Sequence, residues 1–170
     1  MDYFHVDDHI LLRFAEEKDI AIILEFIRSL AEYEHLLDMV EIKEADLKKY
    51  LFEKKLIEVV IGEYDGIPAG FALFFHNFST FLGRPGIFIE DIFVKPEFRG
   101  KGLGKIFFSF LAKIAVERNC GRLEWACLDW NKPSIEFYKS QGARPLDEWT
   151  TYRLTRDGIM KLAEGFSFNK

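Results

Sequence analysis

The spacing of apolar residues predicts a series of helices separated by strands. Between Lys18 and Tyr33, apolar positions recur every three or four residues, which is the spacing of an amphipathic helix. Similar spacing predicts four more helices, at residues 42–52, 103–119, 131–140 and 157–163. Pro133 suits the first turn of the helix at 131–140, and Gly142 follows its end as a left-handed cap.

Runs of apolar residues predict the strands that lie between these helices. They fall at residues 10–14, 57–64, 67–75, 86–94, 122–128, 143–146 and 151–154. Asp65-Gly66 is a strong two-residue hairpin signal between the second and third of them. Residues 76–85 are rich in turn formers and are predicted to be a loop. The pattern contains no repeat and no linker, so it predicts one mixed α/β domain over residues 1–170, with 1–9 as an N-terminal extension.

Composition and charge restrict the class of protein. The chain has 170 residues, of which 49% are hydrophobic and 30% are charged, and this is the balance of a soluble globular protein. A formal net charge of −5 offers no electrostatic footprint for nucleic acid or an anionic membrane, so neither is expected as a partner. The N-terminus lacks the pattern of a signal peptide and no apolar run approaches a membrane span, which predicts a cytoplasmic protein.

The candidate metal ligands and the cysteines point to no additional chemistry. His5 and His9 stand among acids in the N-terminal extension without further ligands at a metal-binding spacing, so no metal is expected. Cys120 and Cys127 are expected to be reduced structural thiols rather than a disulfide framework. The 18 phenylalanines predict a bulky core and would also suit an apolar subunit interface.

The glycine-rich loop from Arg99 to Gly104 is the strongest candidate for a functional site. It follows a strand and precedes a helix, so free backbone N–H groups and the helix dipole predict an anion site. A P-loop would need Gly-Lys followed by Ser or Thr, whereas Lys101 here is followed by Gly102. A dinucleotide fingerprint would need G-x-G-x-x-G early in the chain, whereas the order here is G-x-G-x-G. Both of these phosphate sites are therefore excluded.

Together with other segments, this loop resembles the GNAT superfamily of acetyltransferases. AEYE in the first helix, FIEDIFVKPEFRGKGLG, LDWNKPSIEFYKSQGA and the late Trp149 are similar to the spermidine/spermine and thialysine acetyltransferase group. The resemblance implies a mostly antiparallel central sheet with helices on both faces, acetyl-CoA as co-substrate, a small cationic amine as acceptor, and a homodimer. The segment Leu128-Asp129-Trp130-Asn131 looks more like the thialysine-type relatives than the polyamine-type ones.

The resemblance assigns the acetyl-CoA contacts to two regions of the chain. The backbone groups for the pantetheine arm come from Ile92, Phe93 and Val94. The expected pyrophosphate contacts are Arg99, Gly100, Lys101, Gly102, Leu103, Gly104 and Lys105. Of these, Lys101 and Lys105 would either contact the 3′-phosphate or be solvated. The second region comprises Asn131, Lys132, Pro133 and Ser134.

Proton transfer is expected to involve Glu90 and Tyr138. A primary alkylamine with a pKa of about 10 is mostly protonated at neutral pH, so its acetylation needs proton removal. Glu90 is expected to take this proton through water; the alternative is that it only binds the ammonium. Tyr138 falls where the family keeps its general acid, although by itself it would be read as an amphipathic helix residue. The expected amine contacts are Tyr33, Glu34, Glu90, Asp91 and Trp149.

Two other functions compete with small-amine acetylation. One is acetylation of a protein N-terminus or lysine, for which an open groove would be more suitable than an acidic pocket. The other is a non-catalytic acyl-CoA-binding module, and the presence of both Glu90 and Tyr138 argues against it.

Overall fold

The computed structural model describes residues 3–166, which fall into two compact units, the first ending at Leu128 and the second beginning at Asp129. The helices are α1 (Ile20–Tyr33), α2 (Glu44–Leu47), α3 (Leu103–Glu117), α4 (Lys132–Ser140) and α5 (Arg156–Ala163). The strands are β1 (Tyr3–His5), β2 (Ile10–Phe14), β3 (Glu58–Tyr64), β4 (Ile67–Ser79), β5 (Arg84–Val94) and β6 (Leu123–Trp125). Short 3-10 turns cover Glu17–Asp19, Leu37–Met39 and Pro96–Phe98, and a π-helix covers Lys48–Glu53.

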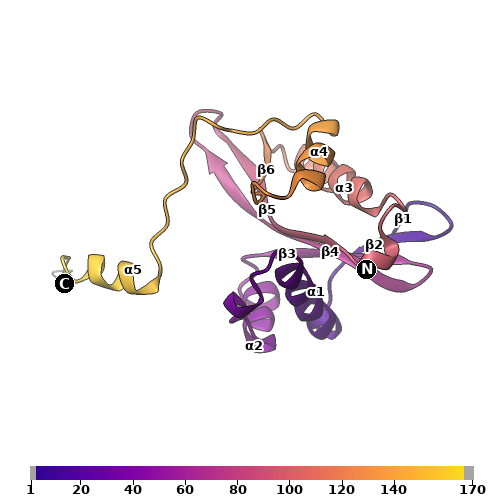
Figure 1. Ribbon diagram of the computed structural model, residues 1–170, viewed down its shortest axis with the longest axis horizontal. Coiled ribbons are helices and arrows are strands. Elements are labelled where there is room, and N and C mark those ends of the chain that lie inside the picture. The colour runs from indigo at the N-terminus through magenta and orange to yellow at the C-terminus, as the bar shows by residue number, and fades with distance from the viewer. Residues whose placement is uncertain (1–2, 167–170) are drawn as a thin grey trace. The chain divides into compact units, whose positions relative to one another are not determined.

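The first unit is a twisted sheet with strand order β1-β2-β3-β4-β5-β6. All neighbouring strands are antiparallel except β5 and β6, which run parallel. Helices α1 and α2 lie on one face of the sheet and α3 on the other (Figure 1). The predicted class, a mostly antiparallel sheet with helices on both faces, is therefore confirmed. Residues 3–5 of the predicted N-terminal extension form β1 and join this sheet.

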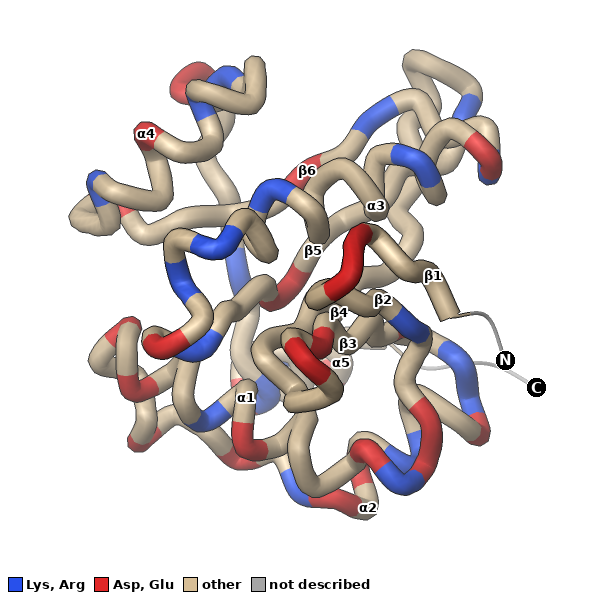
Figure 2. The backbone as a smooth tube through the Cα atoms, turned by 90° about the vertical axis from the view of Figure 1, so that its right-hand side faces the viewer, with Lys and Arg blue, Asp and Glu red and all other residues tan. Residues whose placement is uncertain are grey.

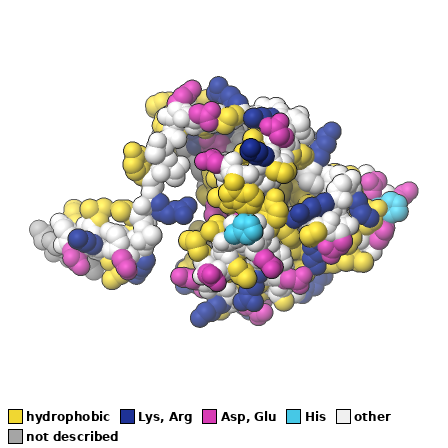
Figure 3. Space-filling view, in the orientation of Figure 1, with side chains coloured by type: hydrophobic (Ala, Val, Ile, Leu, Met, Phe, Trp, Pro, Cys, Tyr) yellow, Lys and Arg dark blue, Asp and Glu magenta, His cyan; other side chains and the backbone are white. Residues whose placement is uncertain are grey.

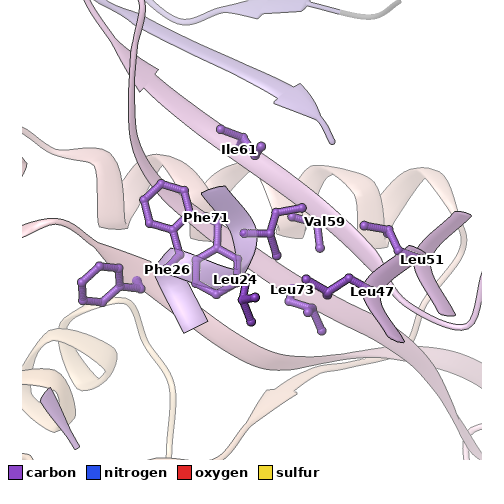
Figure 4. Close-up of a cluster of buried hydrophobic side chains, with 10 residues drawn as sticks. Leu24, Phe26, Leu47, Leu51, Val59, Ile61, Phe71 and Leu73 are labelled. Atoms are coloured by element: carbon purple, nitrogen blue, oxygen red, sulfur yellow. The ribbon is translucent and has the colours of Figure 1, made fainter. Parts of the chain in front are cut away.

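Aromatic packing joins α1 to the middle of the sheet. The ring of Phe26 stacks on Phe71 of β4 at 5.4 Å and lies 6.3 Å from Phe93 of β5. Figure 4 shows Phe26 and Phe71 beside Leu24 of α1, Leu47 of α2, Val59 of β3 and Leu73 of β4. Burial of such side chains contributes roughly 1.5–3 kcal/mol each, so this cluster fixes where α1 lies on the sheet. Its buried members are Ile23, Leu24, Phe26, Leu47, Leu51, Val59, Ile61, Phe71, Leu73 and Phe93.

On the opposite face, α3 packs so closely that β3 requires a glycine. A Cβ atom built on Gly62 would lie 2.7 Å from Cζ of Phe107 and 3.2 Å from a methyl group of Leu103. Both α3 side chains are buried. This contact places the N-terminal end of α3, and with it the glycine-rich loop, against the sheet.

A buried ion cluster connects the start of α1 to the sheet. The guanidinium of Arg13 on β2 donates to both carboxylate oxygens of Asp19, at 2.6 and 2.9 Å, and to Glu63 on β3 at 2.7 Å. The Asp19 carboxylate also accepts a bond from the backbone N–H of Glu16. Arg13 and Asp19 are both buried, and the guanidinium helps to hold the pKa of Asp19 below its ordinary value. Buried charges of this kind hold their geometry because every lost partner is costly.

Several predicted elements differ from the structure. The loop predicted at 76–85 is mostly strand, because β4 runs to Ser79 and β5 begins at Arg84. The predicted helix at 42–52 divides into α2 and the π-helix, and the strand at 122–128 shortens to β6. The late strands predicted at 143–146 and 151–154 are wrong. Extended segments need a neighbouring strand for their backbone hydrogen bonds, and the second unit as described has none.

The second unit, described by itself, contains α4, an irregular segment and α5. Asn131 caps α4, since its Oδ1 accepts a hydrogen bond from the N–H of Ser134. Helix α5 leaves apolar side chains exposed, as Figure 3 shows. These exposed side chains are Ile159, Met160 and Leu162.

Candidate active site

The glycine-rich loop leads directly into an uncapped helix N-terminus. Gly100 and Gly102 have φ angles of 76° and 88°, a region that residues with a Cβ adopt only with strain. Gly102 is the N-cap of α3, and no described side chain caps that end. A Cβ atom on Gly100 would meet nothing within 4 Å, so the loop surface is open. The free N–H groups of the first α3 turn therefore suit an anion such as the pyrophosphate of acetyl-CoA.

The two lysines of this loop differ in their surroundings. Nζ of Lys101 lies 4.1 Å from the centre of the Tyr64 ring, at the end of β3. That ring also stacks on the imidazole of His9, whose Nδ1 is 2.7 Å from Asp65, and lies 5.8 Å from the ring of Phe98. Lys105 is exposed on α3. The Lys101 side chain is thus turned to the β3–β4 hairpin, while its backbone remains in the loop.

The Arg99 side chain packs on the end of α1. Its Nε donates to the carbonyl oxygen of Val94 at 3.0 Å. Its guanidinium lies 5.1 Å from the ring centre of Tyr33 and 5.7 Å from that of Phe93. Its backbone N–H donates to the carbonyl of Pro96. The motif around Arg99 predicts a pyrophosphate contact and contains no signal for this contact with Tyr33.

A β-bulge in β5 sets the direction of the two acids. Leu73 of β4 pairs with Asp91, but the next residue, Phe74, pairs with Ile89, so Glu90 is the extra residue. Opposed residues point to the same face, and Leu73 belongs to the cluster under α1. Asp91 therefore lies on the α1 face, whereas Glu90 is exposed at the bulge. Bulges commonly redirect side chains beside active sites.

Beyond the bulge, the other edge of β5 is open. The parallel pairing with β6 consists of three residues and ends at Ile89 opposite Trp125. In the described chain, Ile92, Phe93 and Val94 therefore have a strand neighbour only on the β4 side. Unpaired backbone groups along this edge are free to bind an extended ligand. These are the residues predicted to bind the pantetheine arm.

Three carboxylates gather where α1 ends beside β5. Burial first, and then the negative charges of Glu90 and Glu34, raise the pKa of Asp91 to about 6. Burial also raises the pKa of Glu34, which follows the last residue of α1. A site of this kind attracts a cation, because a positive ligand relieves the repulsion among the carboxylates. The structure thus brings together four predicted amine contacts: Tyr33, Glu34, Glu90 and Asp91.

The remaining predicted site residues belong to the second unit. Asn131 is buried at the start of α4, Lys132 and Pro133 are exposed in its first turn, and Ser134 donates the capping bond. Tyr138 is half-buried on α4, with its ring 5.7 Å from that of Phe137. Trp149 is 74% exposed in the irregular segment. That these side chains meet the first unit's acids in one site stays a prediction.

Charged residues of both signs are mixed over the surface of the first unit. Figure 2 shows basic and acidic residues interspersed along the helices and loops of the first unit. Among residues 3–166, no group of three or more His, Cys, Asp or Glu side chains is arranged to hold a metal ion. Within the same range, no helix is both long enough and apolar enough to cross a membrane.

Comparisons with known proteins agree with the loop and the fold. Residues 22–143 match the Acetyltransferase (GNAT) family. The chain is 37% identical to a thialysine N-epsilon-acetyltransferase of Sus scrofa, over 91% of this chain and 97% of that protein. It is 41% identical to the L-ornithine N5-acetyltransferase NATA1 of Arabidopsis thaliana, over 75% of this chain and 52% of that one.

A solved structure agrees with this assignment. An integron cassette protein from the mobile metagenome of V. cholerae superposes with a TM-score of 0.77 at 28% identity, covering 93% of this chain and 99% of that one. The predicted resemblance is confirmed by the family match and by these relatives. The chain belongs to the GNAT family and is an acetyltransferase.

Proposed function

We propose that this enzyme transfers the acetyl group of acetyl-CoA to a primary amine of a small cationic compound, a polyamine, a diamine or a lysine-like amino acid such as thialysine. The observation that carries the proposal is the gathering of Glu34, Glu90 and Asp91, where burial and then the neighbouring negative charges raise the pKa of Asp91 to about 6. A cationic alkyl chain would neutralise this cluster, whereas a neutral acceptor would leave the repulsion in place. The names of the thialysine and ornithine relatives support the same substrate class.

The proposed acetyl-CoA contacts lie at the uncapped start of α3, along the open edge of β5 and at the start of α4. The N–H groups from Gly100 to Lys105 would hold the pyrophosphate, because they include the free donors of an uncapped helix start. Ile92 to Val94 would pair with the amides of the pantetheine arm along the open edge of β5. Asn131 to Ser134, at the start of α4, form the second contact region. When bound, acetyl-CoA supplies the thioester whose carbonyl carbon reacts with the amine.

Glu90 is the proposed proton acceptor. It is exposed at the bulge and next to Asp91, so an ammonium held by both carboxylates would have Glu90 within reach, directly or through one water. Asp91 and Glu34 would hold the cation by their charge, and Tyr33 and Trp149 are the proposed aromatic contacts of its alkyl chain. These assignments belong to the proposal, as does the homodimer in which the family uses the residues at the end of its first helix.

Tyr138 is the proposed proton donor. A phenol with a pKa of about 10 keeps its proton at neutral pH and can give it from Oη to a departing thiolate. Helix α4 carries Tyr138 one turn beyond Ser134, so a single helix provides both a proposed cofactor contact and the acid. The proposed transfer is direct, from the thioester to the amine, without an acetylated enzyme residue.

The pH dependence of kcat/KM for the amine tests the proton acceptor. The wild-type acid limb reports the ionisation of the carboxylate cluster in the free enzyme. Glu90→Gln should lower kcat/KM and remove or displace this limb, whereas the exposed control Glu97→Gln should retain it. An unchanged acid limb in Glu90→Gln would refute the role of Glu90 as proton acceptor. If the acid limb were lost only in Asp91→Asn, Asp91 would be the proton acceptor instead.

A further inference from the structure

The C-terminal end of α1 has an unusual charge pattern for a helix. The last turn contains no basic residue, and Glu32 and Glu34 place negative charge at the negative end of the helix dipole. Such an end is destabilised unless a cation from elsewhere lies close to it. The cation that the fold brings there is Arg99 of the glycine-rich loop, whose guanidinium lies over the Tyr33 ring.

The contacts of Arg99 join three parts of the site. Through Nε it holds the carbonyl oxygen of Val94, the last residue of β5. Its guanidinium also lies 5.1 Å from the ring centre of Tyr33, which directly precedes Glu34, and 5.7 Å from that of Phe93. A groove between α1 and the Pro96–Phe98 turn is lined by Arg99, Tyr33 and Phe93, together with Glu32 and Glu97. Arg99 therefore connects the last turn of α1 to the end of the strand that carries Glu90 and Asp91, beside the Lys95–Glu25 ion pair at 3.0 Å.

Resting on the proposed function, we propose that Arg99 is a positioning residue for the amine site rather than a contact of the cofactor anion. Its guanidinium holds Tyr33 and Glu34 against the end of β5, so that Glu34 faces Asp91 before any ligand binds. The backbone N–H of Arg99 is already bonded to Pro96, which leaves the anion to the free N–H groups that follow it. The amine site is thereby linked to the loop that would receive acetyl-CoA.

The two Michaelis constants of Arg99→Gln test this assignment. Loss of a cation–π contact and a charged hydrogen bond at an exposed position corresponds to roughly 5- to 20-fold in binding. We expect the amine KM to rise by about this factor, with the acetyl-CoA KM changing less than about threefold. The amine KM of Arg99→Lys should lie between those of the wild type and Arg99→Gln, because an ammonium keeps the charge but lacks the planar guanidinium. Arg84→Gln, at the opposite end of β5, is the matched control and should change neither constant.

Coupling between Arg99 and Tyr33 separates positioning from a general loss of structure. The amine KM of the double variant Arg99→Gln/Tyr33→Leu should be close to that of Tyr33→Leu alone, since the ring through which Arg99 acts is already missing. If the factors by which the two single variants raise the amine KM multiplied in the double variant, the two residues would act independently and the inference would be overturned. An unchanged amine KM, or a rise in the acetyl-CoA KM that exceeds the rise in the amine KM, would overturn it as well.

Hydrogen exchange tests the same contact without any substrate. The amides of Glu34, His35 and Leu36 bond to carbonyls of α1, and Arg99→Gln should speed their exchange in the unliganded protein. Unaltered exchange there would contradict the positioning role. If the wild type acetylated no small amine, the proposed function would fail, while this measurement would still decide the role of Arg99.

Discussion

Replacing Asp91 by Asn should stabilise the unliganded enzyme at neutral pH. The pKa of Asp91 is raised from the ordinary 3.8 to about 6 by burial and by the charges of Glu90 and Glu34. Between these two values the folded protein retains a proton that the unfolded chain has lost, so the free energy of unfolding falls as the pH rises. Above about pH 6 the full cost is present, about 3 kcal/mol at about 1.4 kcal/mol per pKa unit. Asn has nearly the same size and carries no charge, so it avoids this cost.

Urea denaturation at about pH 8 and about pH 4 measures the effect directly. At the higher pH, Asp91→Asn should be more stable than wild type by up to about 3 kcal/mol, and near pH 4 most of this gain should vanish. The same variant should bind the amine less well, because the cluster has lost a charge. Asp38→Asn, at an exposed position, is the matched control and should change little. A loss of stability, or a gain independent of pH, would refute the reasoning.

Three further predictions concern catalysis, the fold and the cofactor loop. Tyr138→Phe should lower kcat by about 10²–10⁴-fold with little change in the acetyl-CoA KM, and an equal kcat would contradict its role as proton donor. Asp19→Asn removes the carboxylate that accepts two hydrogen bonds from buried Arg13 and leaves Glu63 as its remaining ion-pair partner among the described residues. Thermal or urea unfolding should therefore show a loss of about 1.5–3 kcal/mol in the free energy of unfolding, and a loss under about 0.5 kcal/mol would contradict the role of this pair. Gly102→Ala forces a Cβ onto a φ of 88° and should raise the acetyl-CoA KM several-fold. Gly66→Ala, at a φ of 76° in the hairpin turn, should leave the acetyl-CoA KM unchanged. An equal rise of this KM in both variants would contradict the role of the loop in binding acetyl-CoA.

Much of the first unit could be predicted from the sequence because its signals are local. The apolar stripe that begins at Ile20 gives α1, and Asp65-Gly66 gives the turn between β3 and β4. The prediction of strands at 143–146 and 151–154 was wrong because an apolar run forms a strand only when a neighbouring strand is available for its backbone hydrogen bonds. Tyr152, in the second of these segments, is 90% exposed. The extension of β4 to Ser79 was missed because its pairing with β5 outweighs the turn-forming residues around it.

For the site, the sequence gives the residue types but not how the side chains are arranged. Glu90 and Asp91 stand out as acids in an apolar strand, yet nothing local indicates that a bulge would turn Asp91 to the α1 face. The pKa of Asp91 is raised by burial and by the charges of Glu90 and Glu34, and both the burial and the approach of Glu34 depend on segments that are distant along the chain. Arg99 was recognised by its motif, which carries no information about Tyr33. Such contacts depend on the tertiary fold.

The most direct measurement of the central claim is turnover with a panel of amines. Purified enzyme, acetyl-CoA and one amine at a time, spermidine, putrescine, thialysine, lysine or a short peptide, would be followed by release of free thiol and by the mass of the product. The account predicts N-acetylation of at least one small cationic amine, with activity reduced in Glu90→Gln and in Tyr138→Phe. Turnover on the peptide alone would identify a protein acetyltransferase. Acetyl-CoA binding without turnover on any amine would contradict the account.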